Sequence, residues 1–293
     1  NFGIVVHGGA GVMSGLSEKA QQEIHKNIQE TVSEAYAILE GGGSSLDAVE
    51  HAVSMLEDSP LFNAGRGSVY NSDEVQEMDA SIMDGKNRLT GAIASVSIIK
   101  NPIKLARKVA EETKHVLLVG EGAERFAKDV GIEIVDKDYF HHEERYQRVL
   151  NSKKQISKSM QSSDKIGTVG AVALDRNGNI AAATSTGGMT HKMPGRVGDS
   201  PIIGSGTWAQ NGVCGVSSTG HGEFFIKYQV AREVCVRIEY LNQTLSDSAE
   251  SIISELNALE AKGGLIAIDH MGKISTPFNT CLLYTSPSPR DDR

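Results

Sequence analysis

The order of elements along the sequence predicts an α+β fold, with two sheets packed face to face and helices on the outside. Of the 293 residues, 39% are hydrophobic, which is enough to fill a sizeable core. Short β-branched runs and segments with helical periodicity both occur along the chain. Strand-like segments cluster and helix-like segments cluster, whereas strict alternation would indicate a parallel βαβ sheet.

The N-terminal part predicts a strand followed by two helices. The run FGIVV is expected to be a buried strand that enters a tight turn at HGGAG. Ser17 opens a helical pattern that continues to Leu39 and stops at the glycines 41–43. A second helix begins at Ser44 and ends before Pro60, and PLFNAGRGSVYN is expected to be a loop.

The middle of the chain predicts a hairpin, more helices and then a polar connector. Two strands meet at Asp84–Gly85, and Pro102 suits the first turn of the next helix. HVLLVG predicts a strand and GAERFAKDVG a helix. From Lys137 to Lys165 the periodicity is largely lost, and SKKQISKSMQSSDK is rich in Ser, Lys and Gln. We expect an irregular connector there.

The C-terminal part predicts more strands and two helices. A hairpin turns at Asn177–Gly178, GVCGVSST predicts a strand, and GGLIAIDHMGKISTPF predicts a strand pair. Helices are expected around 223–239 and 247–261. The ending LLYTSPSPRDDR breaks this pattern and looks like translated cloning or adaptor sequence, so we expect residues from Cys281 onward to lie outside the fold. A natural disordered tail is the alternative.

Charge and composition exclude several classes of partner. The net charge is −8 and no run of Lys and Arg offsets it, which argues against nucleic acid and anionic membranes. No apolar run approaches the roughly 18 to 20 residues that span a bilayer, so we expect a soluble protein. The start has no leader-like pattern and no Met, and is interpreted as the beginning of the mature fold. Three cysteines without CxxC spacing indicate free thiols in the cytoplasm: Cys214, Cys235 and Cys281.

Several common catalytic patterns are absent. GSGTWAQNG does not supply the G-x-S-x-G frame of a nucleophile elbow. His141–His142 and Glu143–Glu144 fall in the polar connector, so a solvated segment is favoured over a metal site. HGGAG lacks the spacing of a phosphate-binding loop, and a tight turn is favoured there.

The remaining candidate is a group of threonines around the second hairpin. Gly167–Thr168 stands directly before the first strand, and Thr184 and Thr186 close the second. A threonine at a chain start carries its own base, an α-amine with a pKa of about 7.7 to 8. That base exists only if the bond before Thr168 is cut, and the small, flexible Gly167 allows close approach to its carbonyl.

Six strings in order resemble the isoaspartyl peptidase/plant-type L-asparaginase family of N-terminal nucleophile hydrolases, from Phe2 to Thr280. They are HGGAG, FNAGRGSVYN, EMDASIMDG, IGTVGAVALD, ATSTGGMTHKMPGRVGDSPIIGSG and STGHGE. The resemblance implies a single four-layer αββα sandwich over residues 1–280. It also implies self-cleavage into an α chain, 1–167, and a β chain, 168–280. From the sequence pattern itself, residues 137–167 are expected to form a flexible linker at the end of the α chain, and residues 281–293 a non-native tail.

The resemblance implies a hydrolase that releases L-aspartate from β-aspartyl dipeptides and L-asparagine. Thr168 Oγ would attack first the Gly167 carbonyl and later the substrate, forming an ester each time. Thr186 would orient Thr168. The Thr219 hydroxyl and the Gly220 N–H would form the oxyanion hole.

The same resemblance implies a site for the zwitterionic head of the substrate. Arg196 would bind the α-carboxylate and Asp199 the α-ammonium, while Gly220 and Gly222 line the pocket. Taken without the resemblance, Arg196 and Asp199 read as a surface ion pair. His221 and Glu223 receive no role, and Thr184 is interpreted as a packing residue.

No catalytic cofactor is expected, but the loop LEDSPLFNAGRG resembles the sodium-binding loop of the family. The backbone carbonyls that would hold a structural Na⁺ belong to Leu56, Glu57, Ser59, Phe62, Ala64 and Arg66. The family also implies a homodimer of αβ units.

Two other interpretations stay open. One is a glycosylasparaginase or a threonine aspartase. The sequence shows neither a signal peptide nor paired cysteines, and both absences speak against the glycosylasparaginase. The other is an uncleaved, inactive homologue that acts by binding. If the residues after Thr280 are foreign, one sheet loses an edge strand.

Overall fold

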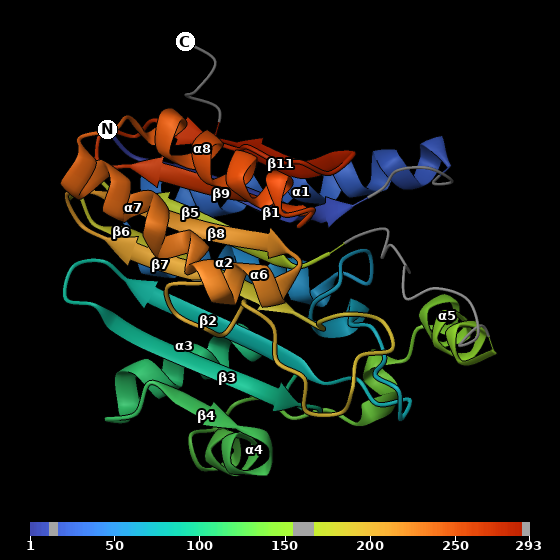
Figure 1. Cartoon of the computed structure of the whole chain (residues 1–293). Helices are drawn as coiled ribbons and strands as arrows, with labels where there is room; N and C mark the ends of the chain where they lie inside the picture. Colours follow the sequence, from blue (N-terminus) through green and yellow to red (C-terminus); the bar gives the residue numbers. More distant parts are fainter. Residues whose placement is uncertain (12–16, 155–166, 289–293) are drawn as a thin grey trace.

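The protein is a sandwich of two β-sheets with helices on both outer faces, as Figure 1 shows for the computed structural model. The structure describes residues 1–11, 17–154 and 167–288. The predicted αββα architecture is therefore confirmed.

One sheet has seven strands in the order β11-β1-β5-β6-β2-β3-β4, antiparallel except for the β3–β4 pair. The hairpin of β5 and β6 lies at its centre and turns at Asn177–Gly178, as predicted. The strands are β1 (Gly3–Gly11), β2 (Met78–Asp84), β3 (Leu89–Val96), β4 (Leu117–Val119), β5 (Val169–Leu174), β6 (Ile180–Thr186) and β11 (Leu282–Pro287).

The second sheet has four antiparallel strands in the order β10-β9-β8-β7. It packs against β1, β2, β5 and β6 of the larger sheet. Its strands are β7 (Thr207–Gln210), β8 (Cys214–Gly220), β9 (Gly263–Asp269) and β10 (Ile274–Ser275). Strand β7 was not expected from the sequence.

Helices cover the outer face of each sheet. Ser17 and Ser44 cap the first two helices by accepting hydrogen bonds from backbone N–H groups, as their positions predict. The helices on the larger sheet are α1 (Glu18–Glu40), α2 (Ser45–Asp58), α3 (Pro102–Glu112) and α4 (Gly120–Asp129). Those on the smaller sheet are α6 (Gly222–Tyr228), α7 (Val230–Leu241) and α8 (Leu245–Ala258).

The single helix expected over 223–239 is two helices. Gln229 lies between α6 and α7 in the left-handed region, with φ of 50°. Its side-chain amide donates a hydrogen bond to Ser205 Oγ at 3.0 Å. This tertiary contact accompanies the break, which apolar periodicity alone could not indicate.

Strand alternation divides the apolar residues between two cores. On β5, Ala171 packs toward α1 to α3, whereas Val172 packs toward the smaller sheet. Val5 of β1 and Ala182 of β6 share the face of Val172. Side chains two residues further along these strands therefore point into the space between the sheets.

The connector is more regular than expected. Residues 137–154 contain a 3₁₀ turn, η2 (Lys137–Phe140), and the helix α5 (Glu143–Lys154), so the expectation of an irregular segment is wrong there. Phe140 is buried, and its carbonyl accepts a hydrogen bond from the side-chain amide of Gln76 at 2.7 Å. The rest of the predicted linker, 155–166, lies outside the described residues.

The histidines of this region contact neighbouring side chains. His141 Nδ1 lies 3.1 Å from the Tyr70 hydroxyl, and His141 Nε2 lies 3.3 Å from Glu143. Within residues 1–11, 17–154 and 167–288, no group of three or more His, Cys, Asp or Glu is arranged to hold a metal ion.

The chain also contributes structure beyond Thr280. Residues 282–287 form β11, which pairs antiparallel with β1 at the edge of the larger sheet. The expectation that the fold ends before Cys281 is therefore wrong for these residues. Their origin stays a prediction.

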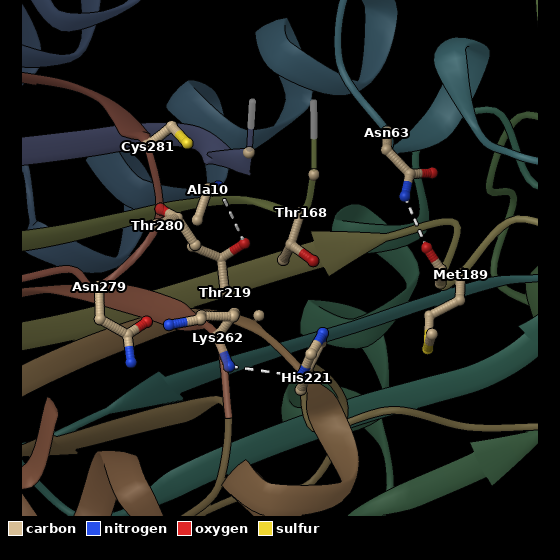
Figure 2. Close-up of a pocket in the computed structure, with 14 residues that line it drawn as sticks. Ala10, Asn63, Thr168, Met189, Thr219, His221, Lys262, Asn279, Thr280 and Cys281 are labelled. Carbon is tan, nitrogen blue, oxygen red and sulfur yellow. Dashed lines mark hydrogen bonds between the residues drawn. The ribbon is translucent and has the colours of Figure 1, made fainter. Parts of the chain in front are cut away.

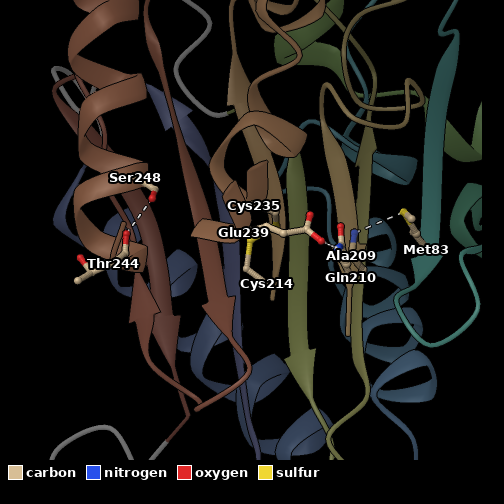
Figure 3. The surroundings of a disulfide bond; sticks show 8 residues. All are labelled: Met83, Ala209, Gln210, Cys214, Cys235, Glu239, Thr244 and Ser248. Carbon is tan, nitrogen blue, oxygen red and sulfur yellow. Dashed lines mark hydrogen bonds between the residues drawn. A yellow bond between two sulfur atoms is a disulfide. The ribbon is translucent and has the colours of Figure 1, made fainter. Parts of the chain in front are cut away.

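Two of the three cysteines form a disulfide, so the expectation of free thiols is wrong for them. Cys214 at the start of β8 is bonded to Cys235 of α7, and both are buried (Figure 3). Cys281 is free and exposed. The cysteines consequently no longer support a reducing compartment. Across the described part of the chain, no helix combines the length and apolar character that crossing a membrane requires.

Candidate active site

A cavity of about 520 Å³ opens at one end of the sandwich, where strands of both sheets meet (Figure 2). Its walls contain four of the predicted site residues, Gly167, Thr168, Thr219 and Gly220. The other lining residues are Ala10, Gly11, Asn63, Gly188, Met189, His221, Lys262, Asn279, Thr280 and Cys281.

Thr168 lies directly before β5 and is 9% exposed. Its hydroxyl donates to Thr186 Oγ1 at 3.0 Å, and Thr186 Oγ1 also accepts from the Gly188 N–H at 3.0 Å. Thr186 ends β6, the strand paired with β5, so the hairpin itself brings the two hydroxyls together. Thr186 can thus hold the Thr168 side chain in one orientation.

The bond between Gly167 and Thr168 is enclosed by backbone from two other segments. The Asn63 N–H donates to the Gly167 carbonyl oxygen at 3.3 Å. Gly9 lies on the other side with φ of 104°, and a β-carbon there would lie 2.5 Å from the Gly167 carbonyl carbon. Only glycine fits this position, because both the contact and the backbone conformation exclude a side chain.

Thr219 approaches the same bond from the smaller sheet. It lies near the end of β8, and its Oγ1 accepts a hydrogen bond from the Ala10 N–H at 3.3 Å. A β-carbon at Gly167 would lie 3.3 Å from Thr219 Oγ1. The site is therefore built from both sheets, with Thr168 and Thr186 on one and Thr219 on the other.

Arg196, Asp199 and Gly222 lie together beside the cavity without lining it. A β-carbon at Gly222 would lie 2.9 Å from Asp199 Oδ1 and 3.0 Å from Arg196 Nη2. Asp199 is buried, and its Oδ2 has no hydrogen-bond partner among the described residues. Burial raises the pKa of Asp199 to about 7, although the Arg196 charge acts to lower it.

Arg196 is paired with Glu223, a residue that received no role from the sequence. The guanidinium donates two hydrogen bonds to the Glu223 carboxylate, from Nε at 2.9 Å and from Nη2 at 3.0 Å. Burial opposes ionisation of Glu223, yet the Arg196 charge holds the pKa of this carboxyl below its usual range. The alternative of a surface ion pair between Arg196 and Asp199 is therefore wrong.

The predicted sodium ligands lie on one continuous stretch. Leu56 and Glu57 are in the last turn of α2, where helix carbonyls lack intrahelical partners, and the 3₁₀ turn η1 (Gly65–Gly67) ends the stretch. A β-carbon at Gly65 would strike the Glu57 carbonyl oxygen. The Arg66 guanidinium stacks over the Tyr139 ring, 5.5 Å from its centroid.

The model of the asparaginase family matches residues 1–291 of this chain. The chain belongs to the asparaginase family. The isoaspartyl peptidase of Escherichia coli strain K12 is 45% identical over 291 residues, which cover 96% of this chain and 91% of that protein.

Mammalian members of the family are similar to a like degree. The isoaspartyl peptidase/L-asparaginase of Rattus norvegicus is 46% identical over 273 residues, covering 92% of this chain and 80% of that protein. The protein of the same name from Homo sapiens is 43% identical over 273 residues, covering 92% and 87%.

Three site residues of this family member were missed by the sequence reasoning. HGGAG was expected to be a tight turn, but it forms the end of β1, where Gly9 abuts Gly167 and Ala10 donates to Thr219. Asn63 stood in a string that carried the resemblance, yet nothing in its spacing indicated a contact with Gly167. All three contacts join segments more than 100 residues apart in the sequence, which local pattern does not encode.

A buried carboxyl braces the strand that carries Thr186. Glu57 Oε1 accepts from the Ser185 hydroxyl at 2.6 Å and from the Ile103 N–H at 3.0 Å. Burial raises the pKa of Glu57 to about 8, and these hydrogen bonds offset only part of that effect. A neutral Glu57 thus links α2, the start of α3 and β6.

Proposed function

We propose that this protein is a self-processing threonine amidohydrolase that acts on β-aspartyl dipeptides and L-asparagine and releases L-aspartate. The observation that carries the proposal is the Thr168 hydroxyl, held by Thr186 at 3.0 Å in a cavity that Thr219 also lines. The names of the relatives, isoaspartyl peptidase and L-asparaginase, support this class of substrate.

Maturation would begin with attack of Thr168 Oγ on the Gly167 carbonyl carbon. The Asn63 N–H donates to the oxygen on which negative charge would develop. The C–N bond breaks, its nitrogen becomes the free α-amine of Thr168, and Gly167 is left as an ester on Oγ. Water then opens the ester and restores the hydroxyl.

In turnover the new α-amine would take the Oγ proton while Oγ attacks the side-chain carbonyl of the substrate. The Thr219 hydroxyl already accepts from the Ala10 N–H, so its own proton is available for the developing oxyanion, together with the Gly220 N–H. Ammonia or an amino acid leaves with a proton, and water hydrolyses the acyl-enzyme to aspartate.

The head of the substrate would bind between Arg196 and Asp199. The Glu223 pairing indicates that the Arg196 fork is oriented for a carboxylate, which the substrate would supply by sharing or replacing that contact. Asp199 offers the buried, unpaired Oδ2 to an ammonium group. Gly222 leaves the space between them.

We propose that the loop after α2 would hold a structural Na⁺. Backbone carbonyls are hard oxygen ligands, and the absence of a β-carbon at Gly67 lets the Phe62 carbonyl oxygen lie against it. The carbonyls of Leu56, Glu57, Ser59, Phe62, Ala64 and Arg66 would hold the ion. Bound there, it would brace the segment that carries Asn63. We further propose a homodimer of αβ units and no catalytic cofactor.

Denaturing electrophoresis of purified protein tests self-processing. We expect two fragments, the smaller beginning TVGAVALD, and a single band for Thr168→Ala. Wild-type protein that stays uncut over days would favour an inactive binding homologue.

Substrate assays separate the proposal from the related hydrolases. The cleaved protein should release aspartate from β-Asp-Leu. Release from a glycosyl-asparagine alone would instead assign a glycosylasparaginase. This assay is needed because Cys214 and Cys235 form a disulfide, so the expected lack of paired cysteines no longer speaks against that enzyme.

A further inference from the structure

Five buried polar side chains form a continuous hydrogen-bonded chain between the two sheets. His7 Nε2 lies 3.0 Å from Ser217 Oγ, and Ser217 Oγ lies 2.6 Å from Thr184 Oγ1. Thr207 donates to Thr184 at 2.7 Å, and Ser81 donates to Thr207 at 2.8 Å. His7, Ser81 and Thr184 belong to the larger sheet, and Thr207 and Ser217 to the smaller one. We call these five residues the intersheet chain.

The intersheet chain lies one layer below the candidate active site. Thr184 stands two residues before Thr186 on β6, and Ser217 stands two residues before Thr219 on β8. Since alternate residues of a strand share a face, each pair points the same way into the space between the sheets. The Thr184–Ser217 hydrogen bond thus joins β6, which carries Thr186, directly to β8, which carries Thr219.

Strand β5, which directly follows Thr168, packs closely against the intersheet chain. Gly170, two residues after Thr168, is the register partner of His7. A β-carbon at Gly170 would strike Ser217 Oγ and would lie 2.5 Å from His7 Nε2. The missing side chain leaves room for the His7–Ser217 pair directly beneath the nucleophile.

The intersheet chain is electrically neutral, and two of its members have further backbone contacts. Burial lowers the pKa of His7 to about 3, with only partial opposition from the Thr168 backbone, so the ring stays uncharged at neutral pH. The Ser81 hydroxyl also reaches the Ser200 carbonyl at 2.6 Å, and Thr184 reaches the Gly206 carbonyl at 3.2 Å. Neutral hydrogen bonds fix geometry without the cost of a buried charge, and among the side-chain polar atoms of these five residues only His7 Nδ1 lacks a partner in the described part of the chain.

We propose that Thr184 and Ser217 are positioning residues, whose hydrogen bond sets the separation between Thr168 and Thr186 on one sheet and Thr219 on the other. The interpretation of Thr184 as a packing residue is corrected accordingly. This inference rests on the proposed function for its kinetic consequences, but its geometric consequence is independent of it.

The size of the effect follows from contact distances. Two oxygens joined by a hydrogen bond lie 2.6 Å apart here, whereas a methyl group needs about 3.5 Å or more from its neighbour. Replacing the Thr184 hydroxyl by a methyl would therefore move the strands apart by up to about 1 Å. A misplacement of this size in an active site can lower a rate by about 100-fold.

The test compares Thr184→Val, which keeps the shape, with Thr184→Ser, which keeps the hydroxyl. Ser218→Ala is the matched control, because Ser218 is buried on the same strand as Ser217 and makes no side-chain hydrogen bond with the described residues. The cleavage rate of freshly made protein, kcat and KM for β-Asp-Leu, and near-UV circular dichroism are measured for each.

We expect Thr184→Val to slow cleavage and lower kcat by at least about 10-fold while KM stays within about threefold. Thr184→Ser and Ser218→Ala should stay close to wild type. The inference would be overturned if Thr184→Val had the same cleavage rate and kcat as the wild type. It would also be overturned if Thr184→Ser lost as much of these rates as Thr184→Val. If Thr184→Val loses its near-UV signal, Ser217→Ala replaces it, with the same expectation and the same overturning result.

A crystal structure keeps the inference testable if the proposed function fails. Wild-type protein that neither cleaves itself nor hydrolyses β-Asp-Leu would contradict the proposed function but not the inferred geometry. In Thr184→Val the distance from Thr168 Oγ to Thr219 Oγ should exceed the wild-type distance by at least about 0.5 Å. An unchanged distance would show that the intersheet chain does not set it.

Discussion

The backbone N–H of Asn63 donates a hydrogen bond to the carbonyl oxygen of Gly167, 104 positions later in the sequence, at 3.3 Å. Asn63 is itself held in place, because its side-chain amide donates to the Gly188 carbonyl at 2.6 Å and its Oδ1 accepts from the Val69 N–H. A rigid donor therefore polarises the carbonyl next to Thr168, which is where the proposed maturation begins.

The approach of Gly9 to Gly167 predicts that Gly9→Ala blocks maturation. The added β-carbon would lie 2.5 to 2.6 Å from backbone atoms of Gly167. The Gly167 carbonyl group would therefore have to move, and it would no longer be in position for attack by Thr168 Oγ. We expect cleavage at least about 10-fold slower on a denaturing gel. Gly42→Ala is the control: it has a similar positive φ, with nothing within 4 Å of the added carbon, and should cleave at the wild-type rate.

The raised pKa of Asp199 predicts a pH dependence of substrate binding. The carboxyl is protonated below its pKa of about 7 and then no longer attracts an ammonium group. KM for β-Asp-Leu should therefore increase as the pH falls below 7, approaching a tenfold increase per pH unit, and level off above it. Asp199→Asn should have a high KM that changes little over the same range. A flat KM profile in the wild type would exclude Asp199 from this role.

The buried Glu57 predicts that stability falls as the pH rises. Its folded pKa, about 8, is raised above the ordinary 4.5, so the folded state binds more protons than the unfolded state between these values. The stability from this group is complete below pH 4.5 and is lost progressively up to about pH 8, by up to about 1.4 kcal/mol per pH unit. Glu57→Gln should flatten that part of the profile.

Urea denaturation of Thr168→Ala protein, with and without Glu57→Gln, measures this slope in an uncleaved chain. Identical slopes in the two proteins would mean that Glu57 is ionised in the folded state.

The disulfide predicts both a thiol count and a loss of stability on reduction. Oxidised protein should have one thiol that reacts with Ellman's reagent, Cys281, before and after denaturation. Cys214 and Cys235 are 21 residues apart, and closing a loop of this size contributes about 3 kcal/mol. Cys235→Ser should lower the free energy of unfolding by about that amount. Three reactive thiols in denatured protein that has not been reduced would contradict the pairing.

Local chemistry made much of the fold predictable. The capping serines 17 and 44, the helix start at Pro102 and the Asn177–Gly178 turn all act within a few residues, and all were placed correctly. The closeness of Thr168 to Thr186 follows from the hairpin in the same way.

The remainder depends on contacts between distant segments. Three features depend on how the two layers pack against each other. They are the break between helices at Gln229, the pairing of Arg196 with Glu223, and the Cys214–Cys235 disulfide. Thr184 is an example. Its sequence context is the same whether its side chain only packs or also forms hydrogen bonds, and the packing of β7 and β8 against β6 decides which of these occurs.

The strand order of the larger sheet has a consequence for the cut protein. Strands β5, β6 and β11 follow Thr168 and the other four precede it, yet the order β11-β1-β5-β6-β2-β3-β4 interleaves them. Cleavage would therefore leave two chains that share three hydrogen-bonded strand boundaries and cannot part without dissolving the sheet. Unfolding would then release two separate molecules, and refolding would become bimolecular. A precursor that folds before it is cut would reach a state that its own fragments, once diluted, would regain only slowly.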